Sequence, residues 1–234
     1  MPHVRRLLAA WGLLLAVGLV LPRAVRPCTL WALGGADVRG GGVILVKNRD
    51  YPPGHPTSFA LTSPARGYRT LVMLSAGASG KPAVVGGVNE KGLAVVTATA
   101  GTIPRSERRR LAREAGLVSP ARPILTRFAS VRELATAKDF LAGVAPVFAL
   151  VADAESVAVL ESSGTAWKLE VMPRDVGAVH ANHPLLIDGP DMRRTPDDPG
   201  SLRRVQRIRE LLAALGKPAD LAAAVELSRD QADG

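Results

Sequence analysis

Cys28 is the only cysteine among the 234 residues of the chain, which makes it the first candidate for chemistry. A thiolate is a strong nucleophile at neutral pH when a neighbouring base or cation helps the thiol to lose its proton. A single cysteine cannot form an internal disulfide, so an exported protein needs another reason to keep it. A buried, inert cysteine is the alternative, but Cys28 stands where a predicted export signal ends, and this position favours a nucleophile.

Residues 1–27 are predicted to be a signal peptide of about 24 residues followed by a short propeptide. Arg5 and Arg6 form a basic start, and the run from Leu7 to Leu21 is wholly apolar. A spanning helix needs about 20 apolar residues, so this run is short for an anchor, although an uncleaved signal-anchor is the alternative. We expect an exported protein, periplasmic or secreted, that touches the membrane only through its signal segment.

The proton acceptor for Cys28 has two candidate sources. The chain has four histidines, and His180 or His183 could form a Cys–His dyad with the thiol. If the chain is cut before Cys28, the new α-amine lies beside the sulfur, and its pKa near 8 lets it accept the proton. A catalytically silent, exported binding module is a third possibility, in which Cys28 is merely structural or membrane-proximal.

The predicted elements give an α+β protein with antiparallel sheets, because hairpins come first, then helices, then a meander and further helices. Strands are expected at 28–33, 43–46, 68–74, 84–88, 93–99, 146–152, 157–161, 165–172 and 177–181. Helices are expected at 123–128, 130–141, 201–215 and 220–227, with Ser130 as a cap, and some helix within 101–122.

Composition limits the function classes. Hydrophobic residues make up 47% and charged residues 22%, as in a globular domain. The formal charge of +9 falls to +5 without the four arginines of residues 1–27. The basic run 105–110 has no interleaved aromatics and is interpreted as a solvated loop or helix start within a surface excursion, so nucleic-acid binding is not expected. No zinc-type spacing, phosphate loop or dinucleotide fingerprint occurs in the sequence, so we expect no metal and no cofactor.

Four short strings, taken in order, resemble one known family. They are Cys28-Thr-Leu-Trp31, Lys47-Asn-Arg-Asp50, Gly87-Val-Asn-Glu-Lys-Gly-Leu93 and Ala181-Asn-His183. The chain resembles N-terminal-nucleophile cysteine hydrolases of the acyl-CoA:6-aminopenicillanic-acid acyltransferase, or linear amide C–N hydrolase, group, which is related to choloylglycine hydrolase and penicillin V acylase. The resemblance implies a four-layer αββα sandwich over 28–234, incomplete at the C-terminus. We interpret Asn89 to Gly92 within the third string as a structural turn.

The resemblance also implies catalytic roles for individual residues. Cys28 would be the nucleophile and its α-amine the base, while Asp50 would hydrogen-bond and orient that amine. Lys47 falls where relatives often place a basic residue near the sulfur, and a cation there favours the thiolate.

The remaining implied residues would bind the oxyanion or support the site. The side-chain amide of Asn182 and the backbone N–H of Thr99 would donate to the oxyanion of the tetrahedral intermediate. Arg204, or Arg203 in the alternative register, matches an arginine near the start of a helix that supports the site in relatives.

These expectations combine into one activity. The chain is predicted to be an exported, autoprocessed amidohydrolase or acyltransferase that cleaves linear amides through a thioester on Cys28. We expect a cut after Ala24 and then autocatalytic loss of residues 25–27. The partner would be a small N-acyl amide with an apolar acyl group, since residues 51–80 offer no cluster of charge; the exact acyl and amine groups and the oligomeric state stay open.

Overall fold

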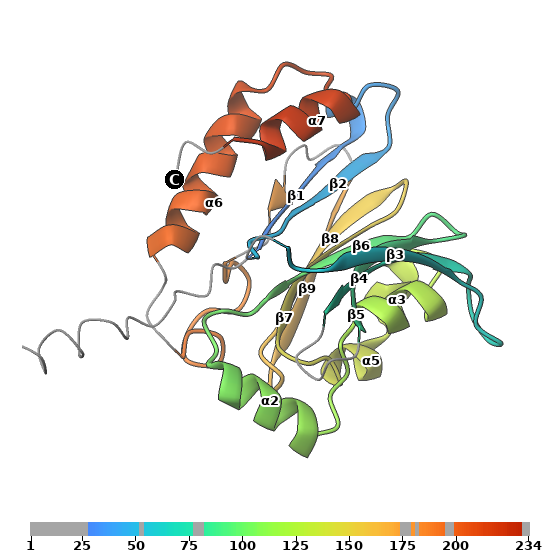
Figure 1. The fold of residues 1–234 in the computed structure, drawn as a ribbon, viewed down its shortest axis with the longest axis vertical. Helices are drawn as coiled ribbons and strands as arrows, with labels where there is room; N and C mark the ends of the chain where they lie inside the picture. Colours follow the sequence, from blue (N-terminus) through green and yellow to red (C-terminus); the bar gives the residue numbers. More distant parts are fainter. Residues whose placement is uncertain are drawn as a thin grey trace, which may run out of the picture.

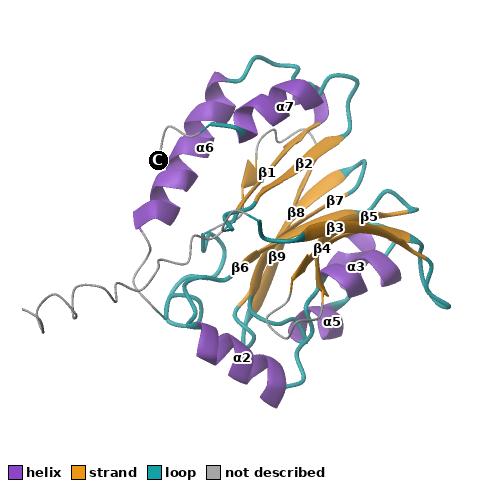
Figure 2. Cartoon of the chain, in the orientation of Figure 1, coloured by secondary structure: helices purple, strands orange, loops and turns teal. Residues whose placement is uncertain are grey.

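The computed structural model describes residues 28–51, 54–76, 82–173, 179–180, 183–194 and 199–230, and these form four layers (Figure 1). Two antiparallel sheets face each other, and helices cover the outer side of each (Figure 2). The predicted αββα arrangement is therefore confirmed. In the part of the chain that the structure describes, no helix combines the length and the apolar character needed to cross a membrane.

The small sheet has the order β10-β1-β2 and carries the N-terminal end of the described chain. Strand β1 spans Thr29–Gly34, β2 spans Val43–Asn48 and β10 spans Val179–His180. The first two strands form the predicted hairpin, in which Thr29 pairs with Asn48 and Gly34 with Val43. Three consecutive glycines with positive φ, 40–42, make the connection after the short 3-10 helix Gly35–Asp37.

The large sheet is a seven-stranded antiparallel meander, because its strands lie side by side in sequence order. They are β3 (Thr57–Thr62), β4 (Thr70–Ala76), β5 (Pro82–Asn89), β6 (Ala94–Thr99), β7 (Val147–Ala152), β8 (Ser156–Ser162) and β9 (Trp167–Pro173). The sequence prediction missed β3. Phe59 and Leu61 in this edge strand are 70% and 77% exposed and only Ala60 between them packs against a core, so the large apolar residues give no useful burial pattern.

The helices lie on the two outer faces and at one end of the large sheet (Figure 1). They are α2 (Arg105–Glu114), α3 (Ala121–Arg127), α4 (Val131–Thr136), α5 (Lys138–Ala142), α6 (Pro199–Ala214) and α7 (Leu221–Ser228). Residues 130–141 were expected to form one helix, which is wrong: Ala137 leaves helical geometry at φ −85° and ψ 59° and separates α4 from α5. The Ser130 cap is confirmed, since its Oγ accepts from the backbone N–H of Glu133 at 3.1 Å.

Three apolar cores hold the layers together, and the two-residue period of the strands assigns side chains to them. Along β1, Leu30 points into the core between the sheets, where it joins Phe148 and other residues of the large sheet. Trp31 points the other way and packs with Ile208 and the rest of the α6–α7 layer. The third core lies between the large sheet and the layer of α3, α4 and α5.

The Asn89–Gly92 turn joins β5 to β6 and has a packing role. The buried Asn89 amide donates to the carbonyls of Leu125 and Phe128 at 2.9 and 2.8 Å. Its Oδ1 accepts from the backbone N–H groups of Lys91 and Leu93, both at 3.0 Å. The first two bonds fasten the hairpin to the end of α3 and the other two fix the turn itself, which supports the structural interpretation of this string.

Candidate active site

Cys28 lies immediately before β1 and on its inner face. It is 6% exposed and belongs to the core between the sheets, in phase with Leu30 and Ala32. It also lines a cavity of about 330 Å³ that reaches β6, β7 and α2. A buried thiol that borders a cavity can meet a small ligand without exposure to bulk solvent.

Lys47 lines the same cavity from β2, the strand paired with β1. Its Nζ donates to the backbone oxygens of Thr97 at 2.6 Å and Val85 at 3.2 Å, so it bridges the small sheet to the large one. The pairing of β5 with β6 ends at Gly86 and Val96. The carbonyls of Val85 and Thr97 lie just beyond this pairing and accept hydrogen bonds from the ammonium of Lys47.

The environment of Lys47 alters its charge. Burial lowers the pKa of Lys47 from 10.5 to about 8, while the nearby Cys28 raises this pKa and Arg49 lowers it further. A lysine with a pKa near 8 is still largely cationic at pH 7. The structure therefore brings a positive charge next to the candidate nucleophile, in keeping with the expectation for this position.

Asp50 follows β2 and approaches α6. Its Oδ2 lies 3.7 Å from Nε of Arg204, and both side chains are largely shielded from solvent. The neighbouring Arg203 is exposed and lines a hollow on the outer side of α6. Of the two arginines left open by the sequence, the structure brings Arg204 to Asp50.

Of the two predicted oxyanion donors, one lies among the described residues. Thr99, the last residue of β6, lines the cavity with Cys28. Asn182 lies outside the described residues, so its place relative to the cavity stays a prediction.

The histidines of the alternative dyad can be placed only in part. His183 is buried, and its Nε2 lies 3.3 Å from Nη1 of Arg193, while His55 contacts Ser75. Neither side chain lines the cavity that holds Cys28. His180 lies in β10, and its side chain is not among those described.

Glu161 on β8 is a buried carboxylate that organises the segment following Asn182. It is fully buried, and its two oxygens accept the backbone N–H groups of Leu185, Leu186 and Ile187 at 2.6, 3.1 and 2.9 Å. Burial raises the pKa of Glu161, and these three N–H groups together with Arg193 oppose that rise. The sequence prediction did not single out Glu161. Its one indication in the sequence is that an acid directly follows the apolar run 157–160.

Replacing Glu161 with glutamine should lower the free energy of unfolding by roughly 1–3 kcal/mol. The amide offers one accepting oxygen, and its NH2 group would face backbone donors, so buried N–H groups lose their acceptors. Urea denaturation of both proteins measures the change. Glu170→Gln in the neighbouring strand is a matched control, since Glu170 is exposed and opposite Val159. Equal stability of Glu161→Gln and the control would contradict this role.

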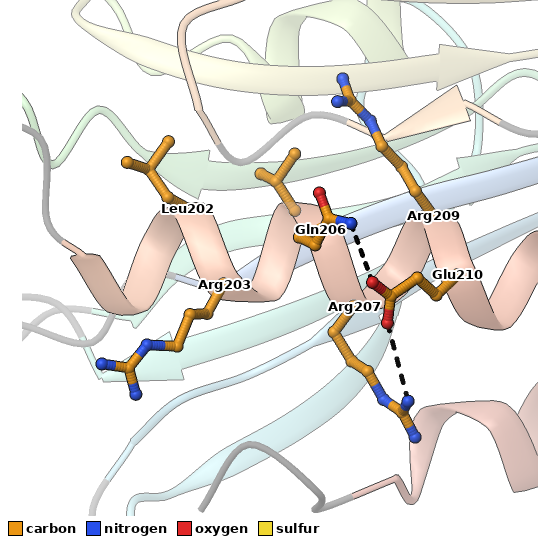
Figure 3. Close-up of a pocket in the computed structure, with 7 residues that line it drawn as sticks. Leu202, Arg203, Gln206, Arg207, Arg209 and Glu210 are labelled. Carbon is orange, nitrogen blue, oxygen red and sulfur yellow. Dashed lines mark hydrogen bonds and ion pairs between the residues drawn. The ribbon is translucent and has the colours of Figure 1, made fainter.

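Another hollow, of about 520 Å³, runs along the outside of α6 (Figure 3). The described residues that line it all come from this one helix, and Glu210 accepts from Gln206 at 2.8 Å and faces Arg207 at 3.8 Å. None of these described lining residues is a thiol or hydroxyl nucleophile. The cavity at Cys28 is therefore the stronger candidate for an active site.

Metal chemistry has no evident support in the described ranges, where no group of three or more His, Cys, Asp or Glu side chains could hold an ion. The cavity residues instead suit nucleophilic and electrostatic chemistry: a thiol, an ammonium, a threonine at a strand end and arginines from α2.

Comparison with known proteins identifies the family. The model of the acyl-coenzyme A:6-aminopenicillanic acid acyl-transferase family matches residues 38–234. The chain belongs to this family. The resemblance inferred from the four strings is thereby confirmed, and the match covers most of the chain. No protein of curated function matches the sequence.

Solved structures show the fold shared by this acyl-transferase family member. The N-acylethanolamine-hydrolyzing acid amidase ortholog of Caenorhabditis elegans is 17% identical, with a TM-score of 0.55 over 88% of this chain and 87% of that one. This likeness confirms the N-terminal-nucleophile hydrolase fold.

Two further structures are more distant. Penicillin V acylase from Agrobacterium tumefaciens is 16% identical with a TM-score of 0.45, and the match covers 86% of this chain and 63% of that one. A mutant conjugated bile acid hydrolase from Clostridium perfringens is 17% identical with a TM-score of 0.39, over 81% of this chain and 58% of that one.

Proposed function

We propose that this family member is an exported cysteine amidohydrolase or acyltransferase that cleaves linear amides through a thioester on Cys28. The observation that carries the proposal is the position of the chain's single cysteine, on the wall of a cavity and next to the ammonium of Lys47. Membership in a family named for acyl transfer supports the reaction class.

Maturation comes first in this scheme. Signal removal after Ala24 leaves residues 25–27 ahead of the nucleophile. The Cys28 sulfur then attacks the carbonyl carbon of Pro27, the peptide C–N bond breaks, and the nitrogen becomes the α-amine of Cys28. Water hydrolyses the resulting thioester, which releases the three-residue remnant and restores the thiol.

Turnover repeats the same chemistry on a small N-acyl amide. The free α-amine, held by Asp50, accepts the thiol proton while the sulfur attacks the substrate carbonyl. The Asn182 amide and the Thr99 backbone N–H stabilise the oxyanion, and such a donor contributes about 3 kcal/mol to the transition state. The protonated amine then gives its proton to the leaving amine, and water or another amine resolves the thioester.

The electrostatics of the cavity fit this order of events. Lys47 keeps a positive charge near the sulfur at neutral pH. Asp50 and Arg204 are not among the described residues that line the cavity, but their ion pair at 3.7 Å orients the carboxylate that, in this scheme, accepts a hydrogen bond from the α-amine.

The decisive experiment is an intact mass of the exported protein, before and after brief exposure to a medium-chain N-acyl amide. We expect a chain that begins at Cys28, and then an added mass equal to one acyl group that hydroxylamine removes as the hydroxamate. Secreted material that still carries Arg26-Pro27 and nevertheless cleaves amides would overturn the proposal.

A further inference from the structure

The cavity beside Cys28 carries a concentration of positive charge. Among the described side chains that line it, four are basic and none is acidic; the basic ones are Lys47, Arg105, Arg108 and Arg109. Like charges gathered in a concave site focus the electrostatic potential and raise the local concentration of anions. Three of the four come from α2, which sequence reasoning treated as a solvated surface excursion.

The arrangement of these arginines is unfavourable for the helix that carries them. Arg105, Arg108 and Arg109 stand three and four residues apart, so they share one face, where like charges destabilise a helix. Arg105 is also the first residue of α2, and the positive end of the helix dipole favours acids there. Local helix stability therefore does not explain the cluster.

The acids of α2 do not neutralise the cluster. Glu107 pairs with Arg110 at 3.7 Å and also binds Arg194, while Glu114 pairs with Arg110 at 2.6 Å. Within the described parts of the chain, the side chains of Arg105 and Arg109 make no hydrogen bond or ion pair, and both residues are exposed at the cavity.

Arg108 has a different part in the cluster. It is half-buried, and its Nη1 donates to the backbone oxygens of Ala100, at 3.0 Å, and Ile103, which fastens the start of α2 to the end of β6. Burial lowers the pKa of Arg108, and the positive charges of Arg105 and Arg109 lower it further. Arg105 and Arg109 are thus the two guanidinium groups available to a ligand.

We propose that Arg105 and Arg109 form a subsite for the carboxylate of an N-acyl amino acid bound at Cys28. This inference rests on the proposed function for the cleavage of an amide at Cys28. The positive charge of the cavity does not depend on that function. Guanidinium groups bind carboxylates through strong, paired hydrogen bonds. Because Cys28, Arg105 and Arg109 line one cavity of about 330 Å³, a single small ligand can reach both the sulfur and α2. The acyl chain remains apolar, as expected; the charge belongs to the amine half.

A matched pair of substrates tests this subsite. N-octanoylglycine and N-octanoylglycinamide have the same length and differ in the charge of one end. The ratio of kcat/KM for the acid to that for the amide should fall at least about 10-fold in Arg105→Gln/Arg109→Gln. The glycinamide value should fall less than the value for the acid, since the amide has no carboxylate for these arginines to bind. Arg113→Gln is the control, because Arg113 lies on α2 and does not line the cavity.

Alkylation of Cys28 tests the same charge without any amidase activity. Iodoacetate and iodoacetamide are similar in size, but only the first is anionic, and the chain has one thiol to report on. The ratio of their labelling rates should fall about 5- to 10-fold in the double variant and hold in Arg113→Gln, and added salt should reduce the wild-type ratio.

The outcomes separate the subsite from the proposed function. In one outcome, neither the wild type nor any variant cleaves amides, but the alkylation ratio still depends on the α2 arginines. That result contradicts the proposed function and supports the anion subsite. Amide cleavage with equal losses for acid and amide, or an alkylation ratio that the double variant leaves unchanged, overturns the subsite. Failure of both reagents to label the wild-type thiol also overturns it, since the cavity is then closed to small anions.

Discussion

Cys28→Ala should abolish both maturation and amide cleavage. Without the sulfur, nothing attacks the Pro27 carbonyl, so the exported chain should retain residues 25–27 and lack a free Cys28 amine. Turnover should fall by a factor of at least about 10⁴, as when the nucleophile of other covalent enzymes is removed. Intact mass gives the first result, and release of amine from an N-acyl amide gives the second.

Two further variants make the Cys28 result specific. Cys28→Ser keeps an oxygen nucleophile, and we expect slow, incomplete loss of residues 25–27 because a hydroxyl is far less ionised than a thiol. Ser106→Ala removes an exposed hydroxyl on α2 and should behave as wild type. Normal removal of residues 25–27 in Cys28→Ala would show that another protease matures the chain.

Lys47→Met should lower kcat/KM by about 100-fold, because loss of an adjacent cation reduces the thiolate population. Lys47→Arg should recover much of this loss, since it restores a permanent positive charge, although the larger guanidinium must fit between the carbonyls of Val85 and Thr97. Exposed Lys168→Met on β9 is a suitable control. Equal inactivity of Lys47→Arg and Lys47→Met would indicate that Lys47 acts as a base.

The pH profile gives an independent check on the charge of Lys47. Its pKa is lowered to about 8, so the wild-type rate should decline above pH 8 as the ammonium loses its proton. In Lys47→Arg this decline should disappear from the accessible range. The stability contribution has the opposite direction: the folded state holds this proton less tightly than the unfolded chain does, so stability from Lys47 rises between about pH 8 and 10.5.

The sequence was sufficient for much of the framework because its strongest patterns are local. Two apolar runs, 28–33 and 43–46, with glycines between them, predicted the hairpin that holds Cys28 and Lys47 on one face. The apolar stripe along 201–215 predicts an amphipathic helix; Val205, Ile208 and Leu212 are buried, whereas Leu202, which belongs to the same stripe, is 44% exposed. The family resemblance assigned Asp50 and one of two arginines to the site without pairing them, and the structure brings Arg204 to Asp50.

Features that depend on distant contacts were out of reach. Glu161 meets a segment more than 20 residues away, and no local pattern says which backbone groups a buried acid accepts from. The α2 arginines read as a solvated run, because only the folded chain brings them to the wall beside Cys28. In β3 the large apolar residues Phe59 and Leu61 are exposed and only the small Ala60 packs against a core, so this strand gave no recognisable pattern.

The bridge from Lys47 to the two carbonyls of the large sheet couples catalysis to architecture. One ammonium both fastens the layers and tunes the sulfur, so any opening of the sandwich removes charge from the thiol at once. We therefore expect the Cys28 thiol of a partly unfolded chain to react slowly, even before the chain is fully denatured. If the chain is exported as we propose, this coupling would keep the Cys28 sulfur of the precursor unreactive until the two sheets have packed together.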